Sequence, residues 1–181
     1  MIRGLTGVAV VAAATLLTGD VLAVGAGGAQ WREVAWPFLM DEWGTGRAFQ
    51  CAQPSCGKPV SLYVRAKVGF CGCSSGVEND DHVDRVSDVG LIDGNSVALA
   101  PGESVAVGPM KGRARPYRVE RQGEPQDVAL AVALSNNCDA VVATAVTSRK
   151  LEPEQERAVY AFLNSETFLD WADANSGYQY R

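Results

Sequence analysis

The chain has 181 residues, of which 47% are hydrophobic and 20% charged, and its formal net charge at neutral pH is −5. This acidic balance excludes a general nucleic-acid binder, because such proteins are normally basic. The fraction of apolar residues is that of an ordinary globular protein.

Residues 1–29 are predicted to be an export signal. Arg3 precedes an uncharged apolar run, and the small residues that follow suit a signal peptidase, which would cut after Ala23 or after Ala29. The run is shorter than the roughly 20 apolar residues that span a bilayer. We therefore expect residues 30–181 to form one periplasmic or secreted domain, with no membrane span after signal cleavage.

An aromatic segment opens the predicted domain. Three of the four tryptophans lie within residues 30–43, together with other large apolar side chains: Trp31, Trp36, Phe38, Leu39, Met40 and Trp43. Pro37 limits a helix here, so the segment is predicted to be an extended entry strand or an irregular cap on the core. The alternative is an aromatic site on which a ligand stacks.

Residues 47–51 and 60–70 are predicted to form a hairpin. In the second strand apolar and polar side chains alternate, which indicates one polar face, with Leu62, Val64, Ala66 and Val68 on one side and Tyr63, Arg65 and Lys67 on the other.

Residues 76–93 are acidic. Asp80 or Asp81 is expected to cap a short helix that carries Val83 and Val86, with its carboxylates on a solvated face. The spacing lacks the ordered ligand register and central glycine of a calcium loop.

Further strands are predicted downstream. Residues 97–99 and 105–107 are expected to pair around Pro101 and Gly102, and residues 117–120 to form another strand. Two apolar runs then flank a loop rich in turn formers, which predicts a second hairpin of residues 127–134 and 140–146.

The C-terminal part is predicted to be helical. Pro153 suits a first helical turn, and Val159, Phe162 and Leu163 share one face at helical spacing. Ser165 is expected to cap a second short helix. The whole indicates an α+β fold, a mostly antiparallel sheet with a C-terminal helix packed on one face.

Two resemblances follow from these segments. A late hairpin, an acidic helix start and the run Ala161-Phe162-Leu163-Asn164-Ser165 resemble the end of PsbP-type α/β/α sandwich domains, over roughly the last third of the chain. The resemblance implies a binding or assembly module and carries no catalytic residue. The runs Trp36-Pro37-Phe38, Asp41-Glu42-Trp43-Gly44 and Phe70-Cys71-Gly72-Cys73 are similar to small exported bacterial proteins of uncharacterised function.

The five cysteines are read as disulfide candidates, because an exported protein meets an oxidising compartment. Cys51 and Cys56 flank a short loop that places them across a hairpin mouth, and they are the best single pair. A second bridge is expected to join Cys71 or Cys73 to Cys138, which leaves one thiol over.

Copper or zinc binding is the competing interpretation of two of these cysteines. Cys71 and Cys73 form a Cys-x-Cys segment whose thiolates suit soft Cu(I), with His82 as the nitrogen ligand to test. Neither close cysteine pair has the Cys-x2-Cys spacing of a zinc ribbon. The disulfide interpretation requires no cofactor.

A basic stripe offers a partner or anion surface. It comprises Lys111, Arg113, Arg115, Arg118 and Arg121, of which Arg113 and Arg115 are expected to share a strand face. The alternative is a solubilising surface partly paired with the acidic segment.

Catalytic motifs are absent from the sequence. There is one histidine, and there is no Gly-x-Ser-x-Gly elbow, phosphate-binding glycine loop or His-Glu-x-x-His. The sequence predicts a non-enzymatic periplasmic binding or assembly module, stapled by disulfides, that presents its sheet edge or aromatic N-terminal segment to a protein partner in the envelope. The alternative is a periplasmic copper- or zinc-handling protein.

Overall fold

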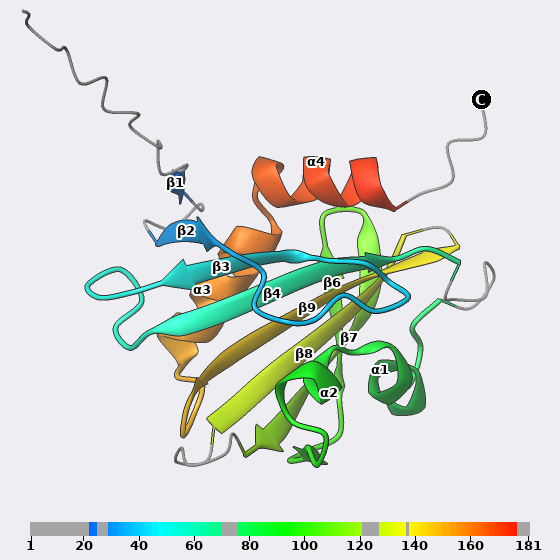
Figure 1. Ribbon diagram of the computed structural model, residues 1–181, viewed down its shortest axis with the longest axis horizontal. Coiled ribbons are helices and arrows are strands. Elements are labelled where there is room, and N and C mark those ends of the chain that lie inside the picture. The colour runs from blue at the N-terminus through cyan, green and yellow to red at the C-terminus, as the bar shows by residue number, and fades with distance from the viewer. Residues whose placement is uncertain (1–21, 25–28, 70–75, 121–126, 137, 177–181) are drawn as a thin grey trace, which may run out of the picture.

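The computed structural model describes residues 22–24, 29–69, 76–120, 127–136 and 138–176. Within these residues nine strands form one antiparallel sheet between two layers of helices (Figure 1). The strands are β1 (Leu22–Val24), β2 (Gln30–Val34), β3 (Arg47–Cys51), β4 (Val60–Lys67), β5 (Val97–Ala98), β6 (Glu103–Val107), β7 (Met110–Val119), β8 (Asp127–Asn136) and β9 (Asp139–Ser148).

The sheet consists of two meanders joined in its middle. The strand order is β1-β2-β3-β4-β9-β8-β7-β5, and β6 also pairs with β7. The join is the antiparallel pair of β4 and β9, in which Ser61 lies opposite Val146 and Lys67 opposite Ala140. Both predicted hairpins, β3 with β4 and β8 with β9, are confirmed.

One predicted strand pairing is wrong. β5 and β6 do not pair with each other, because each pairs with a different part of β7. β7 has ten residues, long enough to hold both short strands, and the predicted strand at residues 117–120 is only its end. The positive φ of Gly108 closes the tight turn that joins β6 directly to β7.

Two C-terminal helices cover the first face of the sheet, as predicted. They are α3 (Pro153–Leu163) and α4 (Glu166–Asn175). Pro153 lies in the first turn of α3, and the Ser165 hydroxyl accepts a hydrogen bond from the Phe168 N–H at 3.4 Å at the start of α4. The ring of Phe162 packs 4.6 Å from that of Phe49 and 5.3 Å from that of Trp31, so aromatic contacts join helix to sheet.

The second face is covered as well, by α1 (Asp80–Val86) and α2 (Val89–Ile92) in front of β7 and β8 (Figure 1). The side chain that caps α1 is Asn79, whose oxygen accepts from the His82 N–H at 3.0 Å, rather than Asp80 or Asp81. The apolar side of these helices packs on a second core cluster, in which small alanines of β8 let the helices approach closely.

The observed fold is α+β, and the predicted fold class is confirmed. The sheet has a core cluster on each side, so it is the middle layer of three. Among the helices described, none is both long and apolar enough to cross a membrane.

Candidate functional site

Residues 35–46 connect β2 to β3 and run across the second face of the sheet in front of β4 (Figure 1). We call them the crossing segment. The sequence predicts an extended entry strand or an irregular cap for residues 30–43, and the structure has both, as β2 and this segment. It carries five of the large apolar side chains that the sequence gathers near the start of the domain.

Three alternate side chains of β4 contact the crossing segment, namely Tyr63, Arg65 and Lys67. The ring of Tyr63 lies 4.9 Å from that of Phe38 and 6.1 Å from that of Trp36, both edge to face. Lys67 lies with its ammonium 5.7 Å from the centre of the Trp43 ring. These side chains form the face that the alternation predicts to be polar, and the crossing segment covers it.

Gly46 makes room for Trp36. A Cβ at this position would lie 2.3 Å from the Val64 carbonyl oxygen and 2.6 Å from a carbon of the Trp36 ring. Any side chain here would have to displace the indole or the strand. The absence of a side chain at Gly46 therefore lets Trp36 lie directly on β4.

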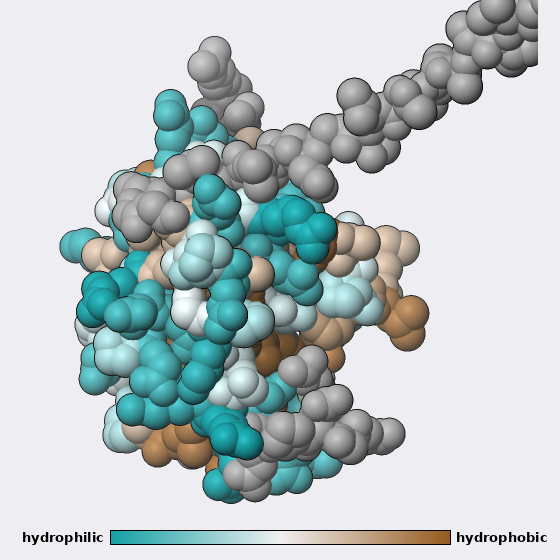
Figure 2. Space-filling model, turned by 90° about the vertical axis from the view of Figure 1, so that its left-hand side faces the viewer, coloured by the Kyte–Doolittle hydropathy of each residue, from teal (hydrophilic) through white to brown (hydrophobic). Residues whose placement is uncertain are grey.

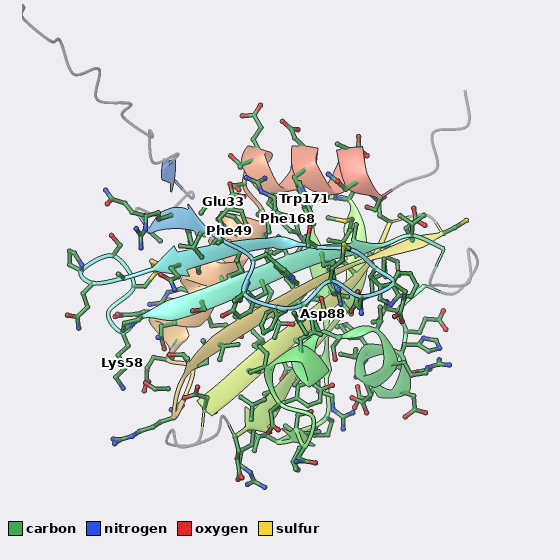
Figure 3. The ribbon with its side chains drawn as sticks, viewed as in Figure 1. Glu33, Phe49, Lys58, Asp88, Phe168 and Trp171 are labelled. Carbon is green, nitrogen blue, oxygen red and sulfur yellow. A yellow bond between two sulfur atoms is a disulfide. The ribbon has the colours of Figure 1, made fainter. Side chains whose placement is uncertain are left out.

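A buried ion cluster, formed by Asp41, Arg65, Lys67 and Asp88, ties the crossing segment to the sheet and to α2. Arg65 is 2% exposed and Asp88 5% exposed. The guanidinium of Arg65 donates two hydrogen bonds to the Asp88 carboxylate, one of them at 2.9 Å, and Lys67 Nζ lies 2.9 Å from the same carboxylate. Asp88, labelled in Figure 3, lies where the second helical layer meets the sheet.

The third guanidinium nitrogen of Arg65 holds the crossing segment. Its Nη1 donates to Asp41 Oδ1 at 2.7 Å and to the Gly44 carbonyl oxygen at 3.2 Å. Asp41 Oδ1 also accepts from the Trp43 N–H at 2.9 Å, which closes a tight turn from Asp41 to Gly44. One buried cation therefore fixes both ends of this turn.

The contacts within this cluster shift the pKa values of Arg65 and Asp41 in favour of their charged forms. Burial alone would lower the pKa of Arg65, but hydrogen bonds to Asp88 and Asp41 outweigh it and raise that pKa above its usual value. Burial alone would raise the pKa of Asp41, and the hydrogen bonds from Arg65 and the Trp43 N–H reverse this, so that its pKa is lowered.

Leu39 and Met40 form what we call the apolar tip. Leu39 is 91% exposed and Met40 75% exposed, the two highest values among the exposed large apolar side chains that the structure describes. The residues on either side, Phe38 and Asp41, are the ones that contact β4. Figure 2 shows that apolar side chains project from one edge of the molecule in that view.

Two arginines of the basic stripe pair with the acidic segment, as the alternative of a partly paired surface predicts, whereas Lys111 is exposed. Arg113 donates to Asp80 Oδ1 at 2.8 Å, and Arg115 donates to both oxygens of Asp84 at 2.7 Å. Arg113 and Arg115 share a strand face as predicted, whereas strand alternation places Arg118 on the opposite face.

The acidic helix face is solvated only in part, because Asp81 is exposed and the Asp84 side chain is 44% exposed, whereas Asp80 and Asp88 turn toward the sheet. Asp80 and Asp84 lie one turn apart on α1, and Asp88 follows just beyond the end of that helix. All three side chains point at the sheet. Each pairs with an arginine of β7 or β4. The carboxylates predicted to face water thus neutralise the cations of the sheet.

The predicted pair of Cys51 and Cys56 is confirmed as a disulfide, with Cα atoms 5.9 Å apart. Cys138 is disulfide-bonded as well. Cys71 and Cys73, proposed as its partner or as a metal site, lie outside the described residues.

His82 has a local role in the structure. Its Nδ1 accepts a hydrogen bond from the Glu78 N–H at 3.3 Å, just before α1. In the part of the chain that the structure describes, no group of three or more His, Cys, Asp or Glu side chains is arranged to hold a metal ion. Copper or zinc binding stays a prediction that depends on the two cysteines outside it.

Sequence reasoning missed the buried ion cluster. The alternation in residues 60–70 predicts only a polar face for Arg65 and Lys67, and the acidic segment predicts a solvated helix face for Asp88. A usable signal was present, because Asp88 stands between the apolar residues Val86 and Val89, a context that favours a buried carboxylate with a cationic partner.

Neither a protein-family model nor a curated protein matches this chain. The resemblance of its last third to PsbP-type domains therefore stays a prediction.

Proposed function

We propose that this protein is a non-enzymatic binding module outside the cytoplasm, and that the apolar tip is its docking element. The partner is a protein of the cell envelope with an apolar pocket that receives Leu39 and Met40. The proposal narrows the expectation that the aromatic N-terminal segment is presented to a partner.

One observation carries the proposal, namely that the apolar tip is exposed although both of its neighbours are fixed. Phe38 packs 4.9 Å from Tyr63, and Asp41 binds Arg65 at 2.7 Å. An exposed leucine in a loose loop would need no explanation. Here a buried ion cluster holds two large apolar side chains in water, at a cost in free energy that a partner can recover.

The size of that gain is substantial for two residues. Burying a leucine or methionine side chain is worth about 1.5–3 kcal/mol each. Because the crossing segment is already ordered, it loses little further conformational entropy on docking. Two such side chains inserted into one pocket have the character of a small binding hot spot.

Charge favours a partner with a cationic rim. Glu42 is exposed two residues after Met40, and the chain carries a formal net charge of −5. The same charge disfavours an anionic lipid surface. Lysine or arginine side chains around an apolar pocket would complement the surroundings of the tip.

The Cys51–Cys56 disulfide supports the proposed location outside the cytoplasm. Disulfides form and persist in oxidising surroundings, and the Cys51–Cys56 bond is compatible with the export that the first 29 residues predict. The partner is therefore sought among proteins of the same compartment.

The proposal is tested by photo-cross-linking in the native host, with a benzophenone amino acid at Glu42 beside the tip. We expect a discrete adduct with one protein, and we expect Leu39→Ser/Met40→Ser in the same chain to reduce it at least about tenfold, as the loss of two buried side chains requires.

The matched control is Val97→Ser/Leu99→Ser, which removes two side chains that are 49% and 48% exposed near the far end of β7. This variant should keep the adduct. The proposal is wrong if no adduct forms, or if the adduct survives loss of the tip. If the purified protein instead floats with phospholipid vesicles, and does so only with an intact tip, the partner is a membrane and the proposed protein partner is wrong.

A further inference from the structure

We propose that Met40 is an oxidation site, and that its conversion to the sulfoxide by a peroxide switches the apolar tip off. This inference rests on the proposed function for its consequence, although the site itself stands on accessibility alone. It assigns a means of regulation to the same two residues.

Accessibility singles out Met40. The chain has three methionines, of which Met1 is the initiator. Met110 is 4% exposed and belongs to the core cluster under α4, whereas Met40 is 75% exposed. Oxidation of methionine follows exposure, so a dilute oxidant in the surrounding medium reaches Met40 first.

The chemistry needs one co-reactant. The thioether sulfur of Met40 attacks one oxygen of a peroxide, the O–O bond breaks, and the second oxygen leaves as water after proton transfer. Sulfur is oxidised by two electrons and the peroxide is reduced by two. No bond of the main chain changes, and methionine sulfoxide reductases return the sulfoxide to the thioether with two electrons from a thiol, releasing the oxygen as water.

The structure predicts that oxidation of Met40 changes only the surface of the apolar tip. Met40 projects into solvent, and the neighbouring residues that hold the segment, Phe38 and Asp41, use contacts that do not involve its sulfur. The sulfoxide is polar, so an apolar pocket accepts it poorly. Oxidation thus alters what the tip offers to a partner and leaves the fold unchanged.

The first measurement is peptide mass spectrometry of the folded mature protein after a short treatment with dilute hydrogen peroxide. We expect one added oxygen on Met40 at a rate at least about tenfold above that of Met110, and equal rates after unfolding in urea. Equal rates in the folded protein would contradict the assignment of the site.

The second measurement repeats the cross-linking from Glu42 with peroxide-treated protein. We expect at least about fivefold less adduct after treatment, and recovery after incubation with methionine sulfoxide reductases and their thiol reductant. Met40→Leu is the matched control, since leucine keeps an apolar side chain without sulfur, and its adduct should not respond to peroxide.

The outcomes separate the two proposals. An adduct that persists when Met40 is fully oxidised overturns the switch and leaves the docking proposal intact. Absence of an adduct before any treatment overturns docking and the switch together. If peroxide treatment removes the adduct of Met40→Leu as fully as that of the wild type, peroxide acts at another residue and the switch is overturned.

Discussion

Arg65 is the residue at which three parts of the fold meet. It belongs to β4, pairs with Asp88 at the start of α2, and binds Asp41 and Gly44 of the crossing segment. Because only 2% of the surface of Arg65 is exposed, these contacts compensate its charge in place of water. A single substitution here should therefore loosen both layers on the second face.

We predict that Arg65→Met lowers the free energy of unfolding by about 3–5 kcal/mol, because it leaves Asp88 buried with only part of its compensation. Arg47→Met is the control on the neighbouring strand. It removes the half-exposed ion pair with Glu33 and should cost about 0–1 kcal/mol. Urea unfolding of both variants measures the difference, and similar losses would mean that burial of Arg65 carries no special weight.

Gly46 gives a second test at this scale. Gly46→Ala should expel Trp36 from β4 and change its fluorescence, because the new Cβ would overlap the indole. Gly44→Ala is the comparison, since its Cβ would meet nothing within 4 Å and only its positive φ, +73°, opposes the change. We expect a cost of about 1 kcal/mol at Gly44 and a larger one at Gly46. An unchanged Trp36 signal in Gly46→Ala would contradict this account of how the segment is seated.

At the scale of elements, the loop between β3 and β4 is closed by Cys51–Cys56 and tied to α3. Gln155, in the first turn of that helix, donates to the Lys58 carbonyl oxygen at 3.1 Å and to the Thr147 hydroxyl at 3.0 Å. The loop is thus held at its base by a covalent bond and along its side by the start of a helix.

Removal of the disulfide should have a limited effect. Cys51→Ala/Cys56→Ala is expected to lower the free energy of unfolding by about 2 kcal/mol, because the closed loop is short and the chain-entropy contribution grows with loop length. Thermal or urea unfolding of the variant and the wild type in the same non-reducing buffer measures it, because the disulfide of Cys138 then stays intact in both. A loss well above this value would show that the loop depends on the bond for its packing.

The elements that the sequence predicts well are those whose signals are local. The alternation in β4, the Pro153 start of α3 and the Ser165 cap of α4 all depend on residues within a few positions of one another. The pairing of β5 and β6 with β7 could not be predicted in this way, because strand partners are chosen by packing across the sheet.

The site was predictable only in part for the same reason. The concentration of apolar residues near Leu39 and Met40 is visible in the sequence, and it indicated a presented segment. The exposure of these two side chains depends on Asp41 meeting Arg65, and the burial of Arg65 is compensated by Asp88 from the start of a distant helix. No window of neighbouring residues contains that information.

At the scale of the whole molecule, several carboxylates link stability to pH. A hydrogen bond from Arg47 lowers the pKa of Glu33, and the Gly102 N–H followed by Arg113 lowers that of Asp80. The N–H groups of Glu120 and Asn95 lower the pKa of Asp93. The pKa of Asp41 is lowered by Arg65 and the Trp43 N–H. All four carboxylates therefore bind protons less readily in the folded state than in the unfolded chain.

The sign of the effect follows from linkage. A carboxylate with a lowered pKa stabilises the fold at pH values above its ordinary pKa, 3.8 for Asp and 4.5 for Glu, and this contribution is lost as the pH falls through the lowered value. We expect the free energy of unfolding to change little between about pH 7 and pH 5.5 and to fall steeply below about pH 4. Urea titrations across this range measure it.

Asp41→Asn tests one part of this dependence. The amide cannot ionise, so the variant should be less stable than the wild type at neutral pH, with a smaller loss of stability on acidification. The difference between the two proteins should shrink as the pH falls. A constant difference across the range would mean that the charge of Asp41 is not what Arg65 recognises.

The join between β4 and β9 has a consequence for the nascent chain. The first meander leaves the ribosome early, but the partner of Ser61 is Val146, so the inner edge of β4 stays unpaired until almost the whole chain has been made. An open edge of this kind readily recruits strands of other chains. A chaperone that holds the chain until β9 has emerged would protect this edge, and a chain truncated before β9 should aggregate instead of folding halfway.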